Sequence, residues 1–425
     1  MPPLGVVIIV NVRTISPKNI AEAVKEIHKI ETDNTLTEWM ANKAVQVCMV
    51  VEDISPFIAD TIKQELTNAG GAVLIQRDQG RGVLGSTNAF IVGNLDQVKK
   101  MLKKLETHSE TLADIGSKMQ LVAQSVEHRE PRYYCCREHR LEIGKKTYTM
   151  GILNITTDSF SGDGLLKTET TSETPNKVSD RAPIKDREQL VEAACERAEK
   201  MVADGADIID VGGESTRPGY AAVDEHEELD RIIGVVEYLV KTLKVPISVD
   251  TSKLYVAEQV LKAGAHIIND VNGLIREPKI AERAAAYGAG VIAMHNPEGP
   301  ITGDIFSHLT CSLRKSIDIA LRAGLNPENI ALDPGIGFGK TLEQNLEVMQ
   351  RLEELGCLGY PVLLGTSRKS MIGKVLDLPV NERLEGTAAT VTLGIAKGVD
   401  FIRVHDIKEM HRVVKMSDAM IRSAT

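Results

Sequence analysis

The stretch VPISVDTSKLYVAEQVLKAGAHIINDVNG, residues 245–273, decides the fold. It holds two short apolar runs, VPISVDT (245–251) and AHIINDVNG (265–273), separated by a segment of helical length. Each run is almost continuously hydrophobic rather than alternating, which is typical of parallel strands buried on both faces. The stretch therefore predicts a strand, a helix and a second, parallel strand.

Six further runs of the same kind lie beyond residue 140, and each precedes a segment long enough for a helix. They are YTMGILNIT (148–156), ADIIDVGGES (206–215), GVIAMHN (290–296), NIALDPGIGFG (329–339), PVLLGTSRKS (361–370) and VDFIRVHD (399–406). Eight strand–helix units in about 280 residues favour an α/β fold of the (β/α)8 TIM-barrel type. An open, doubly wound sheet is the alternative, but it usually has fewer strands. The segment LEIGKKTYT (141–149) predicts a hairpin around Gly144-Lys145 that plugs the bottom of the barrel.

Residues 1–130 predict a smaller N-terminal α/β domain, of a role that the sequence does not define. Its expected strands are 5–10, 44–51, 72–76 and 88–92, and its expected helices are 16–30, 56–69 and 96–126, the last with a break near residue 108. The polar segment EHREPRYYCCREHR (127–140) interrupts the helical pattern at Pro131. We therefore place a boundary at about residues 128–140 and the barrel at 140–425.

The overall charge excludes several classes of partner. The 425 residues carry 50 Lys and Arg against 59 Asp and Glu, a formal net charge of −9, so no general basic field attracts nucleic acid or anionic lipid. The opening apolar run, residues 4–10, is too short for a membrane span and lacks the basic flank of a signal peptide. The six cysteines are scattered without a disulfide pattern. We expect a cytoplasmic protein with reduced thiols.

The candidate chemistry lies where each apolar run turns polar, because reacting groups of such barrels sit at the C-terminal ends of the strands. One polar residue there is more often a cap or a salt-bridge partner, but polar groups follow all eight runs. Asp250, Asp333 and the Asn269 amide could together match the donor and acceptor edge of a flat nitrogen heterocycle. Four cationic candidates could hold a phosphate or a diphosphate at the same mouth: Arg217, Lys369, Arg403 and His405.

Two other motifs give weaker evidence of function. DPGIGFGKT (333–341) ends like the phosphate loop of nucleotide hydrolases, but Pro334 stands where that motif requires its first Gly. His128, Cys135, Cys136 and His139 include two adjacent cysteines, which lack the spacing of a zinc site.

The strings at the strand ends, taken together, resemble one family, dihydropteroate synthase, the pterin-binding barrel enzyme of folate biosynthesis. In the family's order they are MGILNITTDSFSGDG (150–164), DVGGESTRPGY (210–220), SVDTSK (248–253), INDVNG (268–273), LDPGIGFGKT (332–341), GTSRKSMIG (365–373) and EGTAATVTLGIAKGVDFIRVHDI (385–407). The resemblance covers about residues 140–415 and leaves the N-terminal domain unexplained.

The resemblance implies a transferase that joins 4-aminobenzoate to (7,8-dihydropterin-6-yl)methyl diphosphate, giving 7,8-dihydropteroate and diphosphate. It implies a pterin pocket formed by Asp250, Asn269, Asp333 and Lys369, with Met294 and Phe338 as walls. It also implies a magnesium ligand in Asn154, anion contacts from Thr216, Arg217, Arg403 and His405, and a surround of Phe160, Pro218 and Ser367 for the aminobenzoate, where sulfonamides bind. Asp250, Lys369, Arg403, His405 and Arg217 would carry the catalysis. A homodimer through barrel helices is implied as well.

The first loop departs from the family's pattern. Thr157 stands where Pro is common, SGDG where SDGG is common, and a Ser, Thr and charge-rich insertion follows at 165–188, while Ile336 replaces a frequent Phe. Two other functions stay open at this point: a methyltransferase that uses a methylated tetrahydropterin, and a non-catalytic pterin-binding protein. The first does not need the diphosphate site, and the second does not need intact Asn154, Asp250, Lys369 and Arg403.

Overall fold

A computed structural model describes residues 15–30, 33–76, 85–124, 127, 132–155, 184–214 and 223–422. The strand expected at 5–10 lies outside them. The chain divides into two compact units, Met1–Glu130 and Pro131–Thr425. Within the described residues, no helix is long and apolar enough to cross a membrane.

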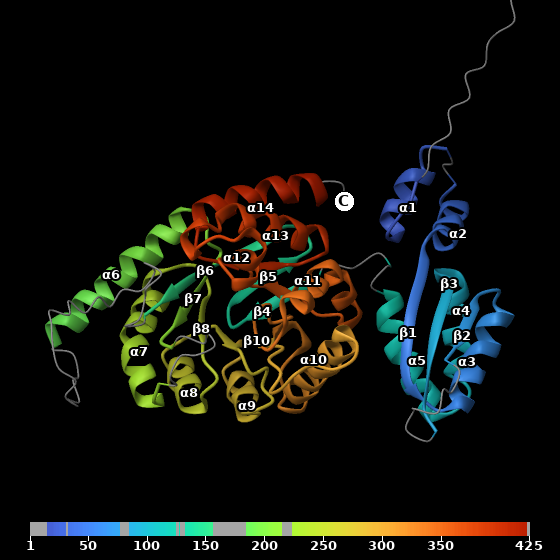
Figure 1. Cartoon of the computed structure of the whole chain (residues 1–425), viewed down its shortest axis with the longest axis horizontal. Helices are drawn as coiled ribbons and strands as arrows, with labels where there is room; N and C mark the ends of the chain where they lie inside the picture. The colour runs from blue at the N-terminus through green and yellow to red at the C-terminus, as the bar shows by residue number, and fades with distance from the viewer. Residues whose placement is uncertain are drawn as a thin grey trace, which may run out of the picture. The chain divides into compact units, whose positions relative to one another are not determined.

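The first unit is a three-stranded antiparallel sheet with helices on one face. The strands β1 (Gln46–Ile54), β2 (Ala72–Ile75) and β3 (Thr87–Asn94) lie in the order β1-β3-β2 (Figure 1). The helices are α1 (Ile20–Ile27), α2 (Asn34–Ala44), α3 (Pro56–Asn68), α4 (Leu95–Leu105) and α5 (Glu110–Gln124). Alternate strand residues, such as Ile91, join Ile62, Leu66 and Met101 in one buried core. The sheet is therefore built on a two-residue period, with one face packed on helices.

Most elements of this unit lie where the sequence predicts them, with two differences. The first helix begins at Ile20 rather than at residue 16, because Asn19 caps it by accepting a hydrogen bond from the backbone N–H of Glu22. Helix α2 was not predicted, since its apolar spacing is weak. Its start signal is Asp33, whose carboxylate accepts the backbone N–H groups of Thr35 and Leu36.

The second unit is a (β/α)8 barrel, as the eight apolar runs predict (Figure 1). Its parallel strands are β6 (Tyr148–Asn154), β7 (Ile208–Gly212), β8 (Ile247–Asp250), β9 (Ile267–Asp270), β10 (Gly290–Met294), β11 (Ile330–Asp333), β12 (Leu363–Leu364) and β13 (Phe401–Val404). The sheet order is β11-β10-β9-β8-β7-β6-β13-β12, and the bridge between Leu332 and Val362 joins its two ends. The open-sheet alternative is thereby excluded.

Helices follow the strands around the outside of the barrel. They are α6 (Ile184–Ala203), α7 (Glu225–Thr242), α8 (Leu254–Lys262), α9 (Lys279–Ala286), α10 (Ile305–Arg322), α11 (Leu342–Gln350), α12 (Ser370–Leu376), α13 (Leu384–Ala396) and α14 (Ile407–Ile421). Outward-facing strand residues such as Val249, Ile268 and Val404 pack with them in one large core. This core explains why the runs are continuously apolar, since both faces of each strand are buried.

The predicted hairpin plug is present, but its position in the sequence was wrong. The hairpin pairs β4 (Arg132–Cys136) with β5 (His139–Ile143), and its turn is Arg137-Glu138 rather than Gly144-Lys145, which instead leads from β5 toward β6. Its apolar residues Tyr134, Cys136 and Ile143 pack inside the barrel against the beginnings of the strands, including Phe401. The aromatic YYCC segment fills the barrel bottom because it supplies the bulk that a Gly-Lys turn lacks.

The direction of each side chain follows from the two-residue period of a strand. Ile208, Ile267, Ile292, Ala331, Leu363 and Phe401 form the apolar layer at the lower end of the interior. Two residues further along, on the same face of each strand, come Asp210, Asn269, Met294, Asp333, Gly365 and Arg403. The interior therefore changes from hydrocarbon to polar groups toward the C-terminal ends of the strands.

Candidate active site

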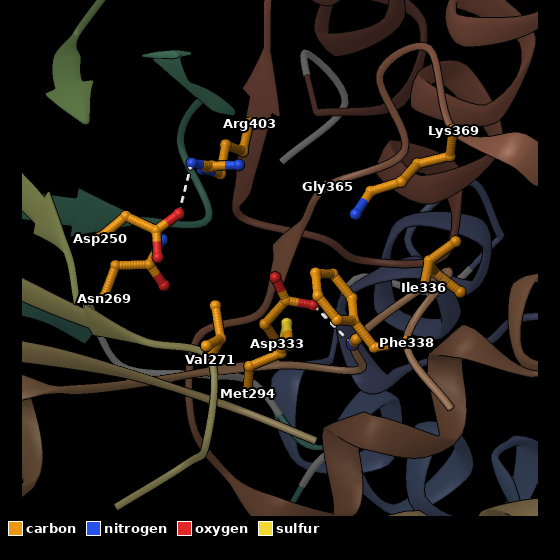
Figure 2. Close-up of a pocket in the computed structure, with 11 residues that line it drawn as sticks. Asp250, Asn269, Val271, Met294, Asp333, Ile336, Phe338, Gly365, Lys369 and Arg403 are labelled. Atoms are coloured by element: carbon orange, nitrogen blue, oxygen red, sulfur yellow. Dashed lines mark hydrogen bonds and ion pairs between the residues drawn. The ribbon is translucent and has the colours of Figure 1, made fainter. Parts of the chain in front are cut away.

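A pocket opens at this polar end of the barrel. It encloses about 340 Å³ of empty space, part of it open to solvent, and its lining comes from six strand ends and the loops after them. The lining residues are Asp250, Asn269, Val271, Met294, Asp333, Gly335, Ile336, Phe338, Gly365, Lys369 and Arg403 (Figure 2). The lining combines apolar walls with several converging polar groups, as binding sites do.

Arg403 joins two buried carboxylates. Its Nε donates to Oδ2 of Asp210 at 2.6 Å. Its terminal nitrogen donates to Oδ2 of Asp250 at 2.8 Å (Figure 2). The Asn269 amide donates to the same Asp210 oxygen at 3.3 Å. The second oxygens of Asp210 and Asp250 are buried without a hydrogen-bond partner among the described residues. An unsatisfied carboxylate oxygen on the pocket-lining Asp250 is a ready acceptor for a ligand N–H.

This charge arrangement shifts the pKa values of Asp250 and Arg403. Burial raises the pKa of Asp250 to about 7, and the neighbouring carboxylates Asp210 and Glu228 add to the rise while Arg403 opposes it. Burial lowers the pKa of Arg403, but Asp210 and Asp250 outweigh it, so the net pKa is raised and the guanidinium stays charged. The site thus holds two acids around one permanent cation, a pattern more common at functional sites than elsewhere.

Asp333 forms the opposite side of the pocket. Its Oδ1 accepts the backbone N–H of Gly335 at 2.7 Å, and burial raises its pKa. The ammonium of Lys369 lies 4.2 Å from the centre of the Phe338 ring, a cation–π contact (Figure 2). Two carboxyl groups, one amide and one ammonium therefore converge on one apolar-walled space.

The loops after β12 and β13 are tied together. Arg368 is held away from the pocket by a two-point ion pair with Asp406, whose bonds measure 3.0 and 2.5 Å. Ser367 Oγ lies 3.0 Å from Nδ1 of His405 and accepts the His405 backbone N–H at 3.2 Å. Ser367 and His405 are therefore neighbours, although neither lines the pocket.

Asn154 is the residue whose chemistry suits a magnesium ion. It is half-buried at the end of β6, and a Cβ added to the adjacent Gly212 would come within 3.2 Å of its Oδ1, so glycine keeps space in front of this oxygen. Magnesium prefers oxygen ligands and commonly takes one or two from protein, with water and substrate phosphate as the others. Asn154 supplies one such oxygen and would take part in holding the ion.

Another group of metal-ligand residue types lies near the hairpin turn at the other end of the barrel: Glu138, His139 and His266. Nδ1 of His266 accepts the backbone N–H of Ile247 at 3.0 Å, so Nε2 carries the proton and faces Glu138 at 3.3 Å. A protonated nitrogen cannot bind a metal. We therefore assign Glu138, His139 and His266 a structural role rather than a metal site.

The structure brings together most of the predicted residues that it describes. Asp250, Asn269, Met294, Asp333, Phe338, Lys369 and Arg403 all line one pocket. Phe160, Thr216, Arg217 and Pro218 lie outside the described residues. Sequence reasoning missed three features. Asp210, the first residue of the DVGGESTRPGY string, was not recognised as the partner of Arg403, whereas Val271 and Gly365 are apolar or small and gave no chemical signal.

Comparisons with known proteins agree with this geometry. The family described as "Pterin binding enzyme" matches residues 168–405. A dihydropteroate synthase of Clostridium beijerinckii is 47% identical over 281 residues, which cover 66% of this chain and 96% of that protein. A crystal structure of dihydropteroate synthase from Clostridium difficile in the presence of pteroic acid is 47% identical, with a TM-score of 0.59, and covers 66% of this chain and 98% of the other.

A further relative reaches into the first unit. It is a probable bifunctional folylpolyglutamate synthase/dihydropteroate synthase of Halobacterium salinarum, 34% identical over 372 residues. The match covers 85% of this chain and 41% of that protein. The unit Pro131–Thr425 is a smaller share of this chain than 85%, so the match extends into the first unit.

Fold and site define a barrel enzyme of the pterin-binding class. Within that class the identity to curated relatives is decisive: the chain belongs to the dihydropteroate synthase family and is a transferase.

Proposed function

We propose that the protein condenses (7,8-dihydropterin-6-yl)methyl diphosphate with 4-aminobenzoate to give 7,8-dihydropteroate and diphosphate. The observation that carries the proposal is the convergence of Asp250, Asn269, Asp333 and Lys369 on one pocket, beside the doubly paired Arg403. The proposal also rests on family membership, which disfavours both the methyltransferase and the non-catalytic alternative.

The pterin ring is bound by complementary polar edges. A pterin presents N–H donors and ring nitrogen and carbonyl acceptors in one plane, so the oxygens of Asp250 and Asp333 take the donors and the Asn269 amide takes an acceptor. Phe338 and Met294 supply apolar walls on its faces. Lys369 adds a further donor at the pocket edge.

The reaction breaks the bond between the pterin methylene carbon and the diphosphate oxygen. The bonding electrons leave with the diphosphate, and the carbon becomes a cation delocalised into the pterin, which Asp250 or Asp333 stabilises electrostatically. The amine nitrogen of 4-aminobenzoate then forms the new bond to this carbon and releases one proton. No nucleophilic side chain is required.

Cationic side chains stabilise the leaving diphosphate. Arg403 and Lys369 are the described cations of the pocket, and Thr216, Arg217 and His405 complete the anion contacts in this proposal. Phe160, Pro218 and Ser367 surround the aminobenzoate. Asn154 would hold a magnesium ion, which when bound neutralises charge on the diphosphate oxygens.

The proposal extends to the setting of the enzyme. We place it in the cytoplasm, as a homodimer formed through barrel helices. The first unit has its own buried core, and we assign it a structural or regulatory role rather than a chemical one.

A coupled assay of diphosphate release tests the proposal. Purified protein, magnesium, the dihydropterin methyl diphosphate and 4-aminobenzoate should release diphosphate and form dihydropteroate, and the reaction without amine serves as control. Tight pterin binding without any product would contradict the proposed reaction.

A further inference from the structure

The loop after β11, residues 335–339, forms one wall of the pocket. Two residues that hydrogen-bond to this loop lie outside the pocket lining. Gly335, Ile336 and Phe338 line the pocket, while Lys340 and Asn345 do not. Gly335, Gly337 and Gly339 have positive φ angles of 66°, 84° and 57°. A loop with three left-handed residues has many alternative shapes, so something outside it has to select the one observed.

Lys340 fastens the inner side of this loop. Its ammonium donates to the backbone carbonyls of Gly335 at 2.8 Å, of Phe338 at 3.1 Å and of His295 at 3.4 Å. The first two belong to the loop, and the third belongs to the end of the neighbouring strand β10. The half-buried Lys340 thus donates hydrogen bonds to three carbonyls, and these bonds link the loop to the barrel.

Asn345, a buried residue of α11, fastens the outer side. Its Oδ1 accepts the backbone N–H of Gly337 at 2.6 Å, and its Nδ2 donates to the carbonyls of Thr341 at 2.6 Å and Lys340 at 3.2 Å. All polar atoms of its side chain are therefore engaged in holding the loop to the start of α11.

The loop, held in this way, fixes the positions of Phe338 and Lys369 in the pocket. The Phe338 ring is the surface over which the Lys369 ammonium lies, and a Cβ on Gly337 would come 3.3 Å from the Lys369 side chain. A movement of the loop would displace Phe338 and Lys369 together, as well as the N–H of Gly335 that Asp333 accepts. Burial lowers the pKa of Lys340 to about 7, with Asp333 raising it and Lys369 lowering it, consistent with a cation held for its geometry at an energetic cost.

We propose that Lys340 and Asn345 are positioning residues that hold the 335–339 loop in the shape that binds the pterin. This inference rests on the proposed function, because it assigns the pterin to the pocket. It predicts a larger effect on the pterin than on 4-aminobenzoate, since neither residue reaches the strand ends that carry Asn154, Ser367 and Arg403.

The test compares Lys340→Met with a matched exposed lysine on α9, Lys279→Met. The probe is the dihydropterin 6-methanol, which carries the heterocycle without diphosphate, and its Kd is measured by calorimetry beside the KM for 4-aminobenzoate. Lys340→Met should raise the Kd by about tenfold or more, since three hydrogen bonds are lost. The KM for the amine should change less than about threefold, and Lys279→Met should match the wild type. Lys340→Arg, which keeps donors, should recover part of the loss.

Several results would overturn the inference: an unchanged Kd in Lys340→Met, an equal loss for both substrates, or no recovery with arginine. If Lys340→Met does not fold, Asn345→Leu decides, since it keeps the shape and removes the bonds to the loop; wild-type pterin affinity in that variant would refute the positioning role. A wild-type protein that does not bind the pterin alcohol would instead refute the proposed function, and the inference with it.

Discussion

Replacing Asp250 by asparagine should make the protein more stable at pH 8 and nearly inactive. Asp250 is only 7% exposed, and burial raises its pKa from 3.8 to about 7. A carboxyl group whose pKa is raised on folding stabilises the protein fully below its unfolded pKa, and this contribution is lost as the pH rises through the folded pKa. At pH 8 the folded protein therefore carries an ionised group that it would hold more favourably as a neutral one.

The size of this effect follows from the pKa rise. A rise from 3.8 to about 7 corresponds to about 4 kcal/mol at about 1.4 kcal/mol per pH unit. The amide resembles the protonated acid in shape, but its carbonyl oxygen accepts from Arg403 less well than the carboxylate does, so we expect a net gain of about 1–3 kcal/mol. The gain should shrink as the pH falls from about 7 toward the unfolded value of 3.8, so it should be smaller at pH 5 than at pH 8.

The assay is urea denaturation of both proteins at pH 5 and pH 8, together with steady-state turnover. Turnover of Asp250→Asn should fall by about 10²-fold or more, because a stabilising charge beside the reacting carbon is lost. Asp270→Asn is the matched control for turnover, since Asp270 is as buried but its oxygens accept the backbone N–H groups of Asn272 and Leu274 instead of facing the pocket. An Asp250→Asn protein less stable than the wild type at pH 8, or one with normal turnover, would refute the reasoning.

Three other predictions follow from the site. Lys369→Ala should weaken binding of the dihydropterin alcohol by about tenfold, whereas Arg403→Ala should mainly raise the KM of the diphosphate substrate; equal effects of both on the alcohol would contradict this division. Asn154→Ala should raise the magnesium concentration for half-maximal turnover by about tenfold, with Asn326→Ala on the surface as control, and an unchanged magnesium titration would remove Asn154 from the metal site. A truncated chain that starts near residue 130 should keep its kcat within about twofold, and a large loss would give the first unit a part in the chemistry.

The sequence predicts the barrel well because each of its eight strands is buried on both faces, so all eight runs stand out as apolar. It predicts the pocket through polar residues that are unfavourable to bury unless they have a function: Asp250, Asn269, Asp333 and Arg403. Of the adjacent Asn269 and Asp270 it names Asn269 for the pocket, although which of the two faces inward depends on strand register. Asn269 lines the pocket, while Asp270 caps the following loop.

The remaining misses have similar physical causes. Arg368 and Lys369 are adjacent in the sequence, yet Arg368 pairs with Asp406, a partner 38 residues away that no local pattern announces. Gly365 lines the pocket through the absence of a side chain, which leaves no chemical signature. The hairpin was misplaced because Gly144-Lys145 is a strong local turn signal, while the strand that pairs is selected by the fit of Tyr134 inside the barrel.

Isotope labelling of the amine tests the central claim most directly. Full-length protein is given the dihydropterin methyl diphosphate, magnesium and 4-aminobenzoate with ¹⁵N in the amino group, and product and diphosphate are quantified together. We predict dihydropteroate with ¹⁵N bonded to the pterin methylene carbon, and one diphosphate released for each molecule formed. Release of diphosphate that does not depend on the amine, or product without the label at that bond, would contradict the account.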